Sequence, residues 1–397
     1  MARKRITLMA DFETTTDPED CRVWASCAVD IDRLEVVHLG TDIDSFMEFL
    51  QDKNSICYFH NLKFDGEFIL YWLLTHGFRC SDSRKDKTFS CLITDDGLFY
   101  SIEVVFHRDK SKKYDKVVFY DSLKKLPFKV AKIAEAFQLK QSKGSIDYKA
   151  RRPVGYQLTE EEKEYIVTDC QIVAEALKVQ MEQGLKRMTN ASDALNGYKS
   201  IIGKSRFEKW FPVLPVELDK DIRRAYKGGF THLMDRFKNA RGLHGKQFDV
   251  NSLYPWVMYT KLLPYGYPKY FEGFPDRDDE YPLFIIHMKC TFELKPGHVP
   301  TVQLKNNRRY IETEYLKTSR VIIGGHEDNE PVEMWLTNVD YELLVDHYEI
   351  DEVTYINGFR FKGVIGLFKE YIDYWMHIKE TETGAKRQLA KLMLNSL

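Results

Sequence analysis

Five residues in the N-terminal half of the chain have the side chains that a hydrolytic metal site requires. Asp11 and Glu13 are two residues apart at the end of a predicted strand, so their carboxylates project from the same face of it. Asp65 lies at the start of a predicted helix. Tyr165 and Asp169 are four residues apart in another predicted helix, where they lie one turn apart on the same side. Together these residues supply four carboxylates and one phenol from three elements.

The chemistry that such a set predicts is metal-dependent hydrolysis. Converging carboxylates repel one another unless divalent cations neutralise them, and oxygen-rich sites of this kind suit Mg²⁺ or Mn²⁺. Two such ions, roughly 3.5–4 Å apart, activate a water molecule and stabilise a leaving oxygen in phosphodiester hydrolysis. Tyr165, one turn from Asp169, is placed to orient that water. Each pattern alone is common, since Asp-x-Glu ends many solvated strands, Asp65 could cap a helix and Tyr-x-x-x-Asp is usually a surface pattern.

The elements that must position these residues indicate an α/β organisation up to about residue 190. Short apolar runs predict strands at Ile6–Ala10, Val23–Val29, Val36–Leu39 and Ile56–Phe59. Helical spacing and end signals predict one helix capped by Asp42, one over Phe64–Thr75 ended by Gly77, and one from the Thr159–Glu162 capping box to about Leu185. Strands that alternate with helices predict a mixed sheet with helices packed on it.

The pattern changes after Thr189. We expect a helical stretch over Ser192–Trp210, a glycine turn over Ala225–Phe230, a strand over Gln247–Val250, and a loop-heavy insertion with short β-like runs over residues 264–365. Helical periodicity returns at Gly366. The last predicted helix has Leu389, Leu392 and Met393 on one apolar face and stops without a Gly, a Pro or a polar tail, so we expect the chain to be cut there.

Composition excludes several classes of protein. The 397 residues are 44% hydrophobic and 30% charged, which is outside the regime of disorder and long enough for two or three domains. No apolar run approaches the ~20 residues that span a membrane, and the N-terminus lacks the apolar stretch of a signal peptide. Seven cysteines, with no Cys-x-x-Cys pair, predict reduced thiols in a cytosolic setting.

The net charge of −2 conceals an uneven distribution. Residues 108–152 hold fourteen Lys and Arg against five Asp and Glu, a local net of +9, with Tyr114, Phe119, Tyr120 and Phe128 interleaved. This composition predicts a track for the phosphates of a nucleic acid. A solvated lysine-rich face explains it equally well.

Taken together, the carboxylate motifs resemble a known family of nucleases. Asp11-Phe12-Glu13-Thr14, Asn61-x-x-x-Asp65 and Tyr165-x-x-x-Asp169 resemble, in this order, the three motifs of the DEDDy proofreading 3′–5′ exonucleases. The resemblance implies a ribonuclease-H-like exonuclease domain.

A second group of motifs resembles the family B DNA polymerases. Asp249-x-x-Ser252-Leu253-Tyr254-Pro255 resembles motif A, in which the aspartate and the next carbonyl, here of Val250, bind a metal that bridges an incoming triphosphate. The tyrosine would clash with a ribose 2′-hydroxyl and so select deoxynucleotides. Taken alone, Asp249 could be a helix cap and Tyr254 a core aromatic residue.

The roles of two further segments are implied by the resemblance alone. Tyr226-x-Gly228-Gly229 resembles the motif that contacts the template between exonuclease and polymerase domains, since paired glycines let the backbone approach phosphates. Lys391-Leu392-x-x-Asn395-Ser396 resembles motif B of the fingers, whose lysine meets the triphosphate, with Lys379 and Arg387 as assisting cations.

The similarity extends over essentially the whole chain to the protein-primed family B DNA polymerases of phi-29-type bacteriophages. Four segments carry it: Asp11–Thr16, Tyr58–Gly66, Tyr120–Pro127 and Arg152–Tyr156. It implies an exonuclease domain over 1–189, a partial palm over 190–260, a terminal-protein-region insertion over 261–366 and the start of the fingers over 367–397. The fold class is therefore mixed α/β.

The resemblance also assigns roles and partners. It implies that Lys143 assists the exonuclease electrostatically and that Ser122 and Leu123 touch single-stranded DNA and the terminal protein. The other residues expected to bind DNA, the frayed 3′ end included, are Thr14, His60, Asn61, Phe64, Phe68, Tyr226, Gly228, Gly229, Ser252, Asn395 and Ser396. The implied cofactors are two Mg²⁺ or Mn²⁺ ions per active site. The implied partners are primer-template DNA, dNTPs and a phage terminal protein, bound by a monomer in the host cytoplasm without a membrane.

Two departures limit what these residues are expected to do. Ser145 stands in Lys143-Gly144-Ser145-Ile146-Asp147 where the family has an aspartate, so any metal contact from that position is lost or passes to Asp147. The sequence also contains no Asp-Thr-Asp motif C, which supplies the second polymerase carboxylate. We therefore expect exonuclease chemistry and binding of DNA and terminal protein from these residues, whereas strand-displacing polymerisation belongs to the intact enzyme. The alternatives are a stand-alone DEDDy nuclease and a non-catalytic module that docks a terminal protein.

Overall fold

Strand β1 (Ile6–Thr14) lies near the middle of an eight-stranded mixed sheet. The computed structural model describes residues 5–108, 114–141, 144–242, 244–304, 309–311 and 314–397. The strand order is β3-β2-β1-β4-β8-β7-β6-β5, with β1, β4 and β8 parallel to one another. The other strands are β2 (Val23–Asp30), β3 (Glu35–Gly40), β4 (Ser55–Phe59), β5 (Arg79–Cys80), β6 (Thr88–Ile93), β7 (Phe99–Arg108) and β8 (Tyr114–Asp121).

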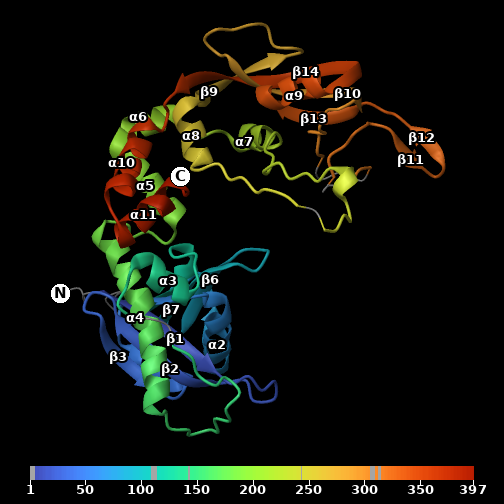
Figure 1. The fold of residues 1–397 in the computed structure, drawn as a ribbon. Helices are drawn as coiled ribbons and strands as arrows, with labels where there is room; N and C mark the ends of the chain where they lie inside the picture. Colours follow the sequence, from blue (N-terminus) through green and yellow to red (C-terminus); the bar gives the residue numbers. More distant parts are fainter. Residues whose placement is uncertain (1–4, 109–113, 142–143, 243, 305–308, 312–313) are drawn as a thin grey trace. The chain divides into compact units, whose positions relative to one another are not determined.

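Each of the strands predicted in this region is confirmed, and β1 is longer than the apolar run that predicted it. Alternate residues of β1 face opposite sides of the sheet. Leu8, Ala10 and Phe12 belong to a core that also contains buried residues of α1 (Ile43–Gln51) and α2 (Leu62–Thr75). Asp11 and Glu13 therefore project from the other side of the sheet, where α4 (Glu160–Glu182) packs against β1 and β2 (Figure 1).

The predicted helix caps are confirmed. The Asp42 side chain accepts a hydrogen bond of 2.7 Å from the Ser45 N–H at the start of α1. Thr159 and Glu162 form the capping box of α4. The remaining helices of this part are the 3₁₀ turn η1 (Ser122–Lys124), α3 (Val130–Phe137), α5 (Asn190–Ile202), α10 (Lys369–Thr381) and α11 (Gly384–Leu394).

The chain divides into two compact units. The first contains Met1–Tyr198 and Asp373–Leu397, because α11 buries its apolar face against α3 and α4. Leu389, Leu392 and Met393 are buried there, as their spacing predicted. The second unit is Lys199–Ile372. The four-part division at residues 189, 260 and 366 stays a proposal.

The second unit has its own sheet and core. Four antiparallel strands follow the order β13-β10-β14-β9, and α9 (Asn338–His347) packs on β10, β13 and β14 (Figure 1). The unit also contains α6 (Lys204–Trp210), α7 (Val216–Arg223), η2 (Asp235–Phe237) and α8 (Leu253–Thr260). Its strands are β9 (Leu262–Glu272), β10 (Leu283–Leu294), β11 (Val321–Ile323), β12 (His326–Asp328), β13 (Val332–Thr337) and β14 (Tyr348–Ile365).

The structure corrects the expectation of a loop-heavy insertion over 264–365. Ile286, Met288 and Cys290 alternate along β10 and pack with Leu336 and Leu344 in a common core. The run of Pro, Gly and Tyr residues over Pro264–Tyr270, which suggested a loop, lies within the long strand β9, where pairing of the backbone outweighs their weak strand preference.

Three smaller expectations are also wrong. The predicted helix Ser192–Trp210 is interrupted by Gly203, whose φ of +82° lies in a region that suits glycine and ends α5. Residues Gln247–Val250 form no strand, because no described segment pairs with them. Gly228 and Gly229 lie in irregular backbone without positive φ values, rather than in a turn.

Two general features complete the description. All seven cysteines are free thiols, as the sequence predicted. Among the described residues, no helix has the length and apolar content needed to cross a membrane.

His38 on β3 gives a prediction for the acid stability of the first unit. Its ring lies 3.0 Å from the Ser26 hydroxyl and beside Phe46 and Phe49. Burial lowers the pKa of His38 from 6.5 to about 4, although Asp42 opposes the shift. Between pH 6.5 and about 4 the unfolded chain binds more protons at this residue than the folded chain does. The stability that neutral His38 contributes is therefore complete above pH 6.5 and is lost as the pH falls through about 4.

We expect the variant His38→Gln to lose less stability than the parent on acidification from pH 6.5 to 4. The difference in the free energy of unfolding is at most about 3 kcal/mol. Urea unfolding at several pH values measures it. Parallel pH profiles of parent and variant would contradict the assignment.

Candidate functional site

Parallel pairing of three strands brings separate motifs to one edge of the sheet. Ala10 of β1 is in register with Phe59 of β4, and Phe59 with Asp121 of β8. The residues that follow each of these, Asp11, His60 and Ser122, therefore begin at the same level of the sheet. This is the edge at which the first two exonuclease motifs meet.

The third motif reaches the same region from α4. Tyr165 and Asp169 are among the buried residues of that helix, and α4 packs against β1 and β2. The charges of Asp169 and Glu13 both raise the pKa of Tyr165, which places this phenol near carboxylates of two different motifs. Side chains of the first and third motifs therefore lie near one another, and their union in one catalytic site stays a prediction.

Asp65 is a strongly perturbed carboxyl of the group. It lies in the first turn of α2, is 2% exposed and accepts a hydrogen bond from the Phe12 N–H. Burial raises the pKa of Asp65 well above its ordinary value, and the charges of Asp11 and Glu13 raise it further. Its Oδ1 atom is buried and has no hydrogen-bond partner among the described residues.

These properties fit a divalent cation in the type and charge of the donors. Buried carboxylates that raise one another's pKa are stabilised by a positive charge, and the unpartnered Oδ1 of Asp65 is an available oxygen ligand. Within the described part of the chain, however, no three acidic, His or Cys side chains form a complete set of metal ligands.

The sequence did not indicate the partner of Tyr165. The Tyr148 hydroxyl lies 2.6 Å from the Tyr165 hydroxyl, and burial together with this hydrogen bond raises the pKa of Tyr165. Tyr165 is thus held as a neutral phenol beside Asp169. Tyr148 follows Asp147 in an irregular segment, so no periodicity could have connected it with α4. Lys143, predicted to assist this site, lies outside the described residues.

The strand ends carry the residues expected to hold single-stranded DNA. His60 lies 2.9 Å from the Ser122 hydroxyl through Nδ1 and 2.7 Å from the Phe128 carbonyl through Nε2. Ser122 is completely buried, which contradicts the expectation that it touches DNA, because its hydroxyl is engaged in orienting His60. Asp121, which we did not single out, accepts hydrogen bonds from the Asn61 and Leu123 N–H groups.

The other residues of this predicted surface are accessible to different degrees. Phe64 is exposed, Phe68 is partly exposed, and their rings lie 5.8 Å apart on α2. Asn61 is exposed in a left-handed conformation at the N-cap of the same helix. Thr14 and Leu123 are partly exposed. These side chains can contact a strand that approaches the sheet edge.

The basic segment 108–152 is not one continuous phosphate track. Lys125 is completely buried and bonded to Asp193. Arg152 is buried between Glu162, at 2.8 Å, and the ring of Trp24. Because they are buried, Lys125 and Arg152 cannot contact the phosphates of a ligand, and the prediction of a phosphate track is wrong for these two residues. The alternative of a solvated lysine-rich face is wrong for them as well.

The residues of the polymerase motifs are accessible but do not form a site in the second unit. Asp249 lies in an exposed, irregular segment, Val250 is exposed, and Tyr254 is 73% exposed on α8. Ser252 caps α8 in a left-handed conformation. Tyr226 is exposed, and a Cβ atom added to Gly228 or Gly229 would meet nothing within 4 Å, so this backbone is open to a ligand.

The predicted nucleotide-binding cations lie in the first unit. The Arg387 side chain donates a hydrogen bond of 3.2 Å to the Lys379 carbonyl, which joins α11 to α10. Lys391 is partly exposed on α11. Asn395 caps that helix, and the Ser396 hydroxyl donates to the Leu392 carbonyl. Asp249 belongs to the other unit.

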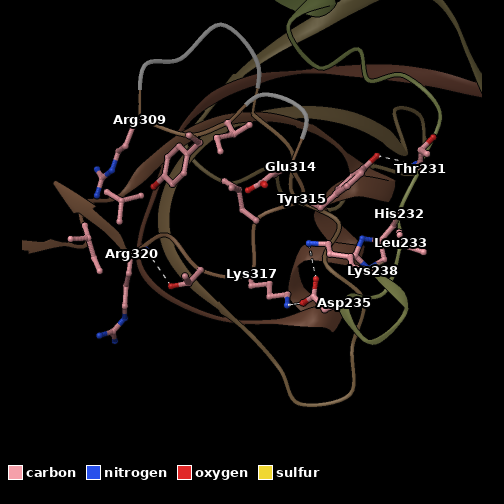
Figure 2. Close-up of a pocket in the computed structure, with 16 residues that line it drawn as sticks. Thr231, His232, Leu233, Asp235, Lys238, Arg309, Glu314, Tyr315, Lys317 and Arg320 are labelled. Carbon is pink, nitrogen blue, oxygen red and sulfur yellow. Dashed lines mark hydrogen bonds and ion pairs between the residues drawn. The ribbon is translucent and has the colours of Figure 1, made fainter. Parts of the chain in front are cut away.

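A cavity of about 740 Å³ lies in the second unit, and none of the predicted catalytic residues lines it (Figure 2). Its lining combines cations with aromatic and aliphatic side chains from two segments, 231–238 and 309–322. Figure 2 shows Asp235 between Lys238 and Lys317, which together lower the pKa of Asp235 to about 2. The Tyr315 ring lies 4.7 Å from that of Phe230.

Comparison with known proteins agrees with the resemblance to the family B DNA polymerases. The family model described as DNA polymerase type B, organellar and viral, matches residues 47–153 and 149–397. The chain is 49% identical over 398 residues to the DNA polymerase of Bacillus phage Nf, covering 100% of this chain and 68% of that protein. It is 51% identical over 387 residues to the DNA polymerase of Bacillus phage phi29, covering 98% and 66%.

Solved structures give the same result. The Phi29 DNA polymerase complexed with primer-template DNA and incoming nucleotide substrates matches with a TM-score of 0.92 and 49% identity, covering 99% of this chain and 68% of that one. The same polymerase complexed with single-stranded DNA matches with a TM-score of 0.89 and 47% identity, covering 99% and 67%. The chain thus spans about two thirds of the length of these relatives.

Proposed function

Because the chain belongs to the organellar and viral type B DNA polymerases, we propose that its first unit is a 3′–5′ exonuclease that proofreads DNA synthesis. The observation that carries this proposal is the burial of Asp65 beside Asp11 and Glu13, with Tyr165 and Asp169 approaching from α4. Burying like charges together costs free energy, so such a cluster points to a function that uses it. Hydrolysis of DNA at divalent cations is a function of this kind.

The proposed chemistry assigns a task to each group of residues. Asp11, Glu13, Asp65 and Asp169 would hold divalent cations, Mg²⁺ or Mn²⁺, which when bound supply charge neutralisation and an activated water. Tyr165, kept neutral and fixed by Tyr148, orients the attacking water through its hydroxyl.

Beside these groups, the open surface at the sheet edge receives the strand. Phe64 and Phe68 stack on bases of the frayed 3′ end, while His60, Thr14, Asn61 and Leu123 contact its backbone.

We also propose that the polymerase motifs serve nucleotide addition. Asp249 and the Val250 carbonyl would bind metal, Tyr254 would exclude ribonucleotides, and Lys379, Arg387 and Lys391 would contact the triphosphate. Ser252, Asn395, Ser396 and the Tyr226-x-Gly228-Gly229 segment would contact DNA. Protein priming by a terminal protein and strand displacement are inferred from the resemblance of the motifs to the phi-29-type polymerases.

A direct assay tests the exonuclease. The 397-residue chain is incubated with a primer labelled at its 5′ end, Mg²⁺ and all four dNTPs. We expect stepwise shortening of the primer without extension, because the sequence holds the Asp249 motif but no Asp-Thr-Asp motif. Sustained extension would contradict the need for that second carboxylate, and an intact primer would contradict the exonuclease.

Tyr165→Phe gives a graded result within the same assay. Loss of the hydroxyl removes the group that orients water but leaves all four carboxylates, so we expect a decrease in kcat of ~10–100-fold. Tyr148→Phe, which removes only the partner of that hydroxyl, is expected to have a smaller effect. Equal activity of Tyr165→Phe and the parent would show that this phenol takes no part.

The cavity in the second unit favours a second function, the docking of a terminal protein. Its mixed cationic and aromatic lining lies largely in the 261–366 segment that the resemblance assigns to this partner. Pull-down with the terminal protein of a phage relative, with and without residues 261–366, tests the proposal. Equal capture by both chains would contradict it.

A further inference from the structure

Lys125 is a completely buried lysine that the carboxylate chemistry does not use. It follows the turn η1, and its ammonium group donates to Asp193 Oδ2 at 2.5 Å and to the carbonyls of Leu185 and Arg187, each at 3.1 Å. Burial lowers the pKa of Lys125, and the Asp193 carboxylate opposes the shift. A buried cation is tolerated only when its donors are satisfied in this way, so the position has a specific structural requirement.

The backbone of Lys125 is hydrogen-bonded to α4 and α5 as well. Its carbonyl accepts hydrogen bonds from Gln180 Nε2 at 3.0 Å and from Asn190 Nδ2 at 2.8 Å. Asp193 also accepts from the Arg187 N–H at 2.9 Å. The segment after β8 is therefore tied to the end of α4 and the start of α5 through polar contacts at one residue.

This segment also orients His60. The Ser122 hydroxyl and the Phe128 carbonyl contact the two ring nitrogens of His60. The N–H groups of Lys125 and Leu126 both donate to the Ser122 carbonyl, at 2.9 and 2.7 Å. The Phe128 N–H in turn donates to the Leu126 carbonyl at 2.8 Å, so backbone hydrogen bonds connect Lys125 and Leu126 with both residues that hold the imidazole.

We propose that Lys125 is a positioning residue, which through the 122–128 segment places His60 and Leu123 for binding the single-stranded 3′ end. It does not touch the DNA itself, since its side chain is buried away from the surface. The inference rests on the proposed exonuclease function and deepens it. It assigns to a lysine of the basic segment a role other than phosphate binding.

A single and a double variant distinguish the loss of positioning from the loss of folding. Lys125→Met leaves Asp193 buried without its cation, whereas Lys125→Met/Asp193→Leu removes both charges and restores a neutral interior. Neither variant retains a donor for the Leu185 and Arg187 carbonyls. Lys204→Met is the matched control, because Lys204 forms an exposed pair with Glu208 on α6.

The readout is a comparison of two substrates of the exonuclease. Single-stranded DNA needs the His60 surface, whereas the p-nitrophenyl ester of thymidine 5′-monophosphate needs only the carboxylate site. We expect the double variant to raise KM for DNA about tenfold, a loss of the size of one good contact, while kcat/KM for the ester stays within twofold. Equal losses on both substrates, or no loss on DNA, would overturn the proposal.

A binding measurement keeps this test independent of catalysis. Fluorescence anisotropy of a labelled oligo(dT) in EDTA reports affinity for single-stranded DNA without hydrolysis. We expect the double variant to bind about tenfold more weakly than the parent and Lys204→Met to bind as the parent does. A parent that binds DNA but hydrolyses neither substrate would refute the exonuclease and leave this comparison valid, whereas unchanged affinity in the double variant would refute the role of Lys125.

Discussion

Replacement of both Asp11 and Asp65 by alanine is expected to lower the exonuclease rate by ~10³-fold or more. The two carboxylates come from different motifs and lie close enough for the charge of Asp11 to raise the pKa of Asp65. Removing them takes away two of the four proposed cation ligands, so both cation binding and activation of water should fail. Release of a labelled 3′ nucleotide from single-stranded DNA measures the effect.

The same variant should respond differently to Mg²⁺ in thermal unfolding. In the parent, added Mg²⁺ should raise Tm because it neutralises carboxylates that are buried together. The double variant lacks this repulsion, so its Tm without metal should equal or exceed that of the parent, and Mg²⁺ should have no effect. Glu208→Ala/Asp279→Ala is the control, since both carboxylates are exposed. Rapid degradation of DNA by the Asp11/Asp65 variant would refute the site assignment.

Lys125→Met is expected to destabilise the first unit by about 3–5 kcal/mol, the usual cost of leaving a buried charge without its partner. Asp193, 2.5 Å from the ammonium group, is itself almost completely buried. Lys125→Met/Asp193→Leu should recover most of this loss, because no isolated charge remains. Urea unfolding monitored by circular dichroism gives the free energies.

The exposed ion pair of Lys204 and Glu208 provides the comparison for these measurements of unfolding free energy. Lys204→Met should change the free energy of unfolding by less than about 0.5 kcal/mol, since exposed ion pairs contribute little. If Lys125→Met is as stable as Lys204→Met, the buried pair is not the structural anchor described above. If the double variant is as unstable as the single one, packing rather than charge determines the loss.

Local structure in the first unit could be read from the sequence because its signals act over a few residues. The side chain of Asp42 caps α1, and the Thr159–Glu162 box begins α4. Alternation along β1 placed Asp11 and Glu13 on one face, and the four-residue spacing placed Tyr165 and Asp169 on one side of a helix. Each of these facts depends on backbone geometry that repeats within one element.

Contacts between distant segments could not be read in this way. Tyr148 reaches Tyr165 from an irregular segment, which has no repeating geometry to predict it. The 264–365 region appeared to be loops because strand preference depends on neighbours that the local sequence does not name. Residues 247–250 appeared to be a strand, yet no described strand pairs with them.

The residue types at the proposed exonuclease site, their order and the elements that carry them follow from the amino-acid sequence. Which of the charges are buried follows from how the elements pack. Lys125 and Arg152 occur in a run that composition assigns to the surface, but the fold encloses each of them with a carboxylate. The physical reason is that burial depends on which elements pack together, and a charge is stable inside only where another element supplies its partner.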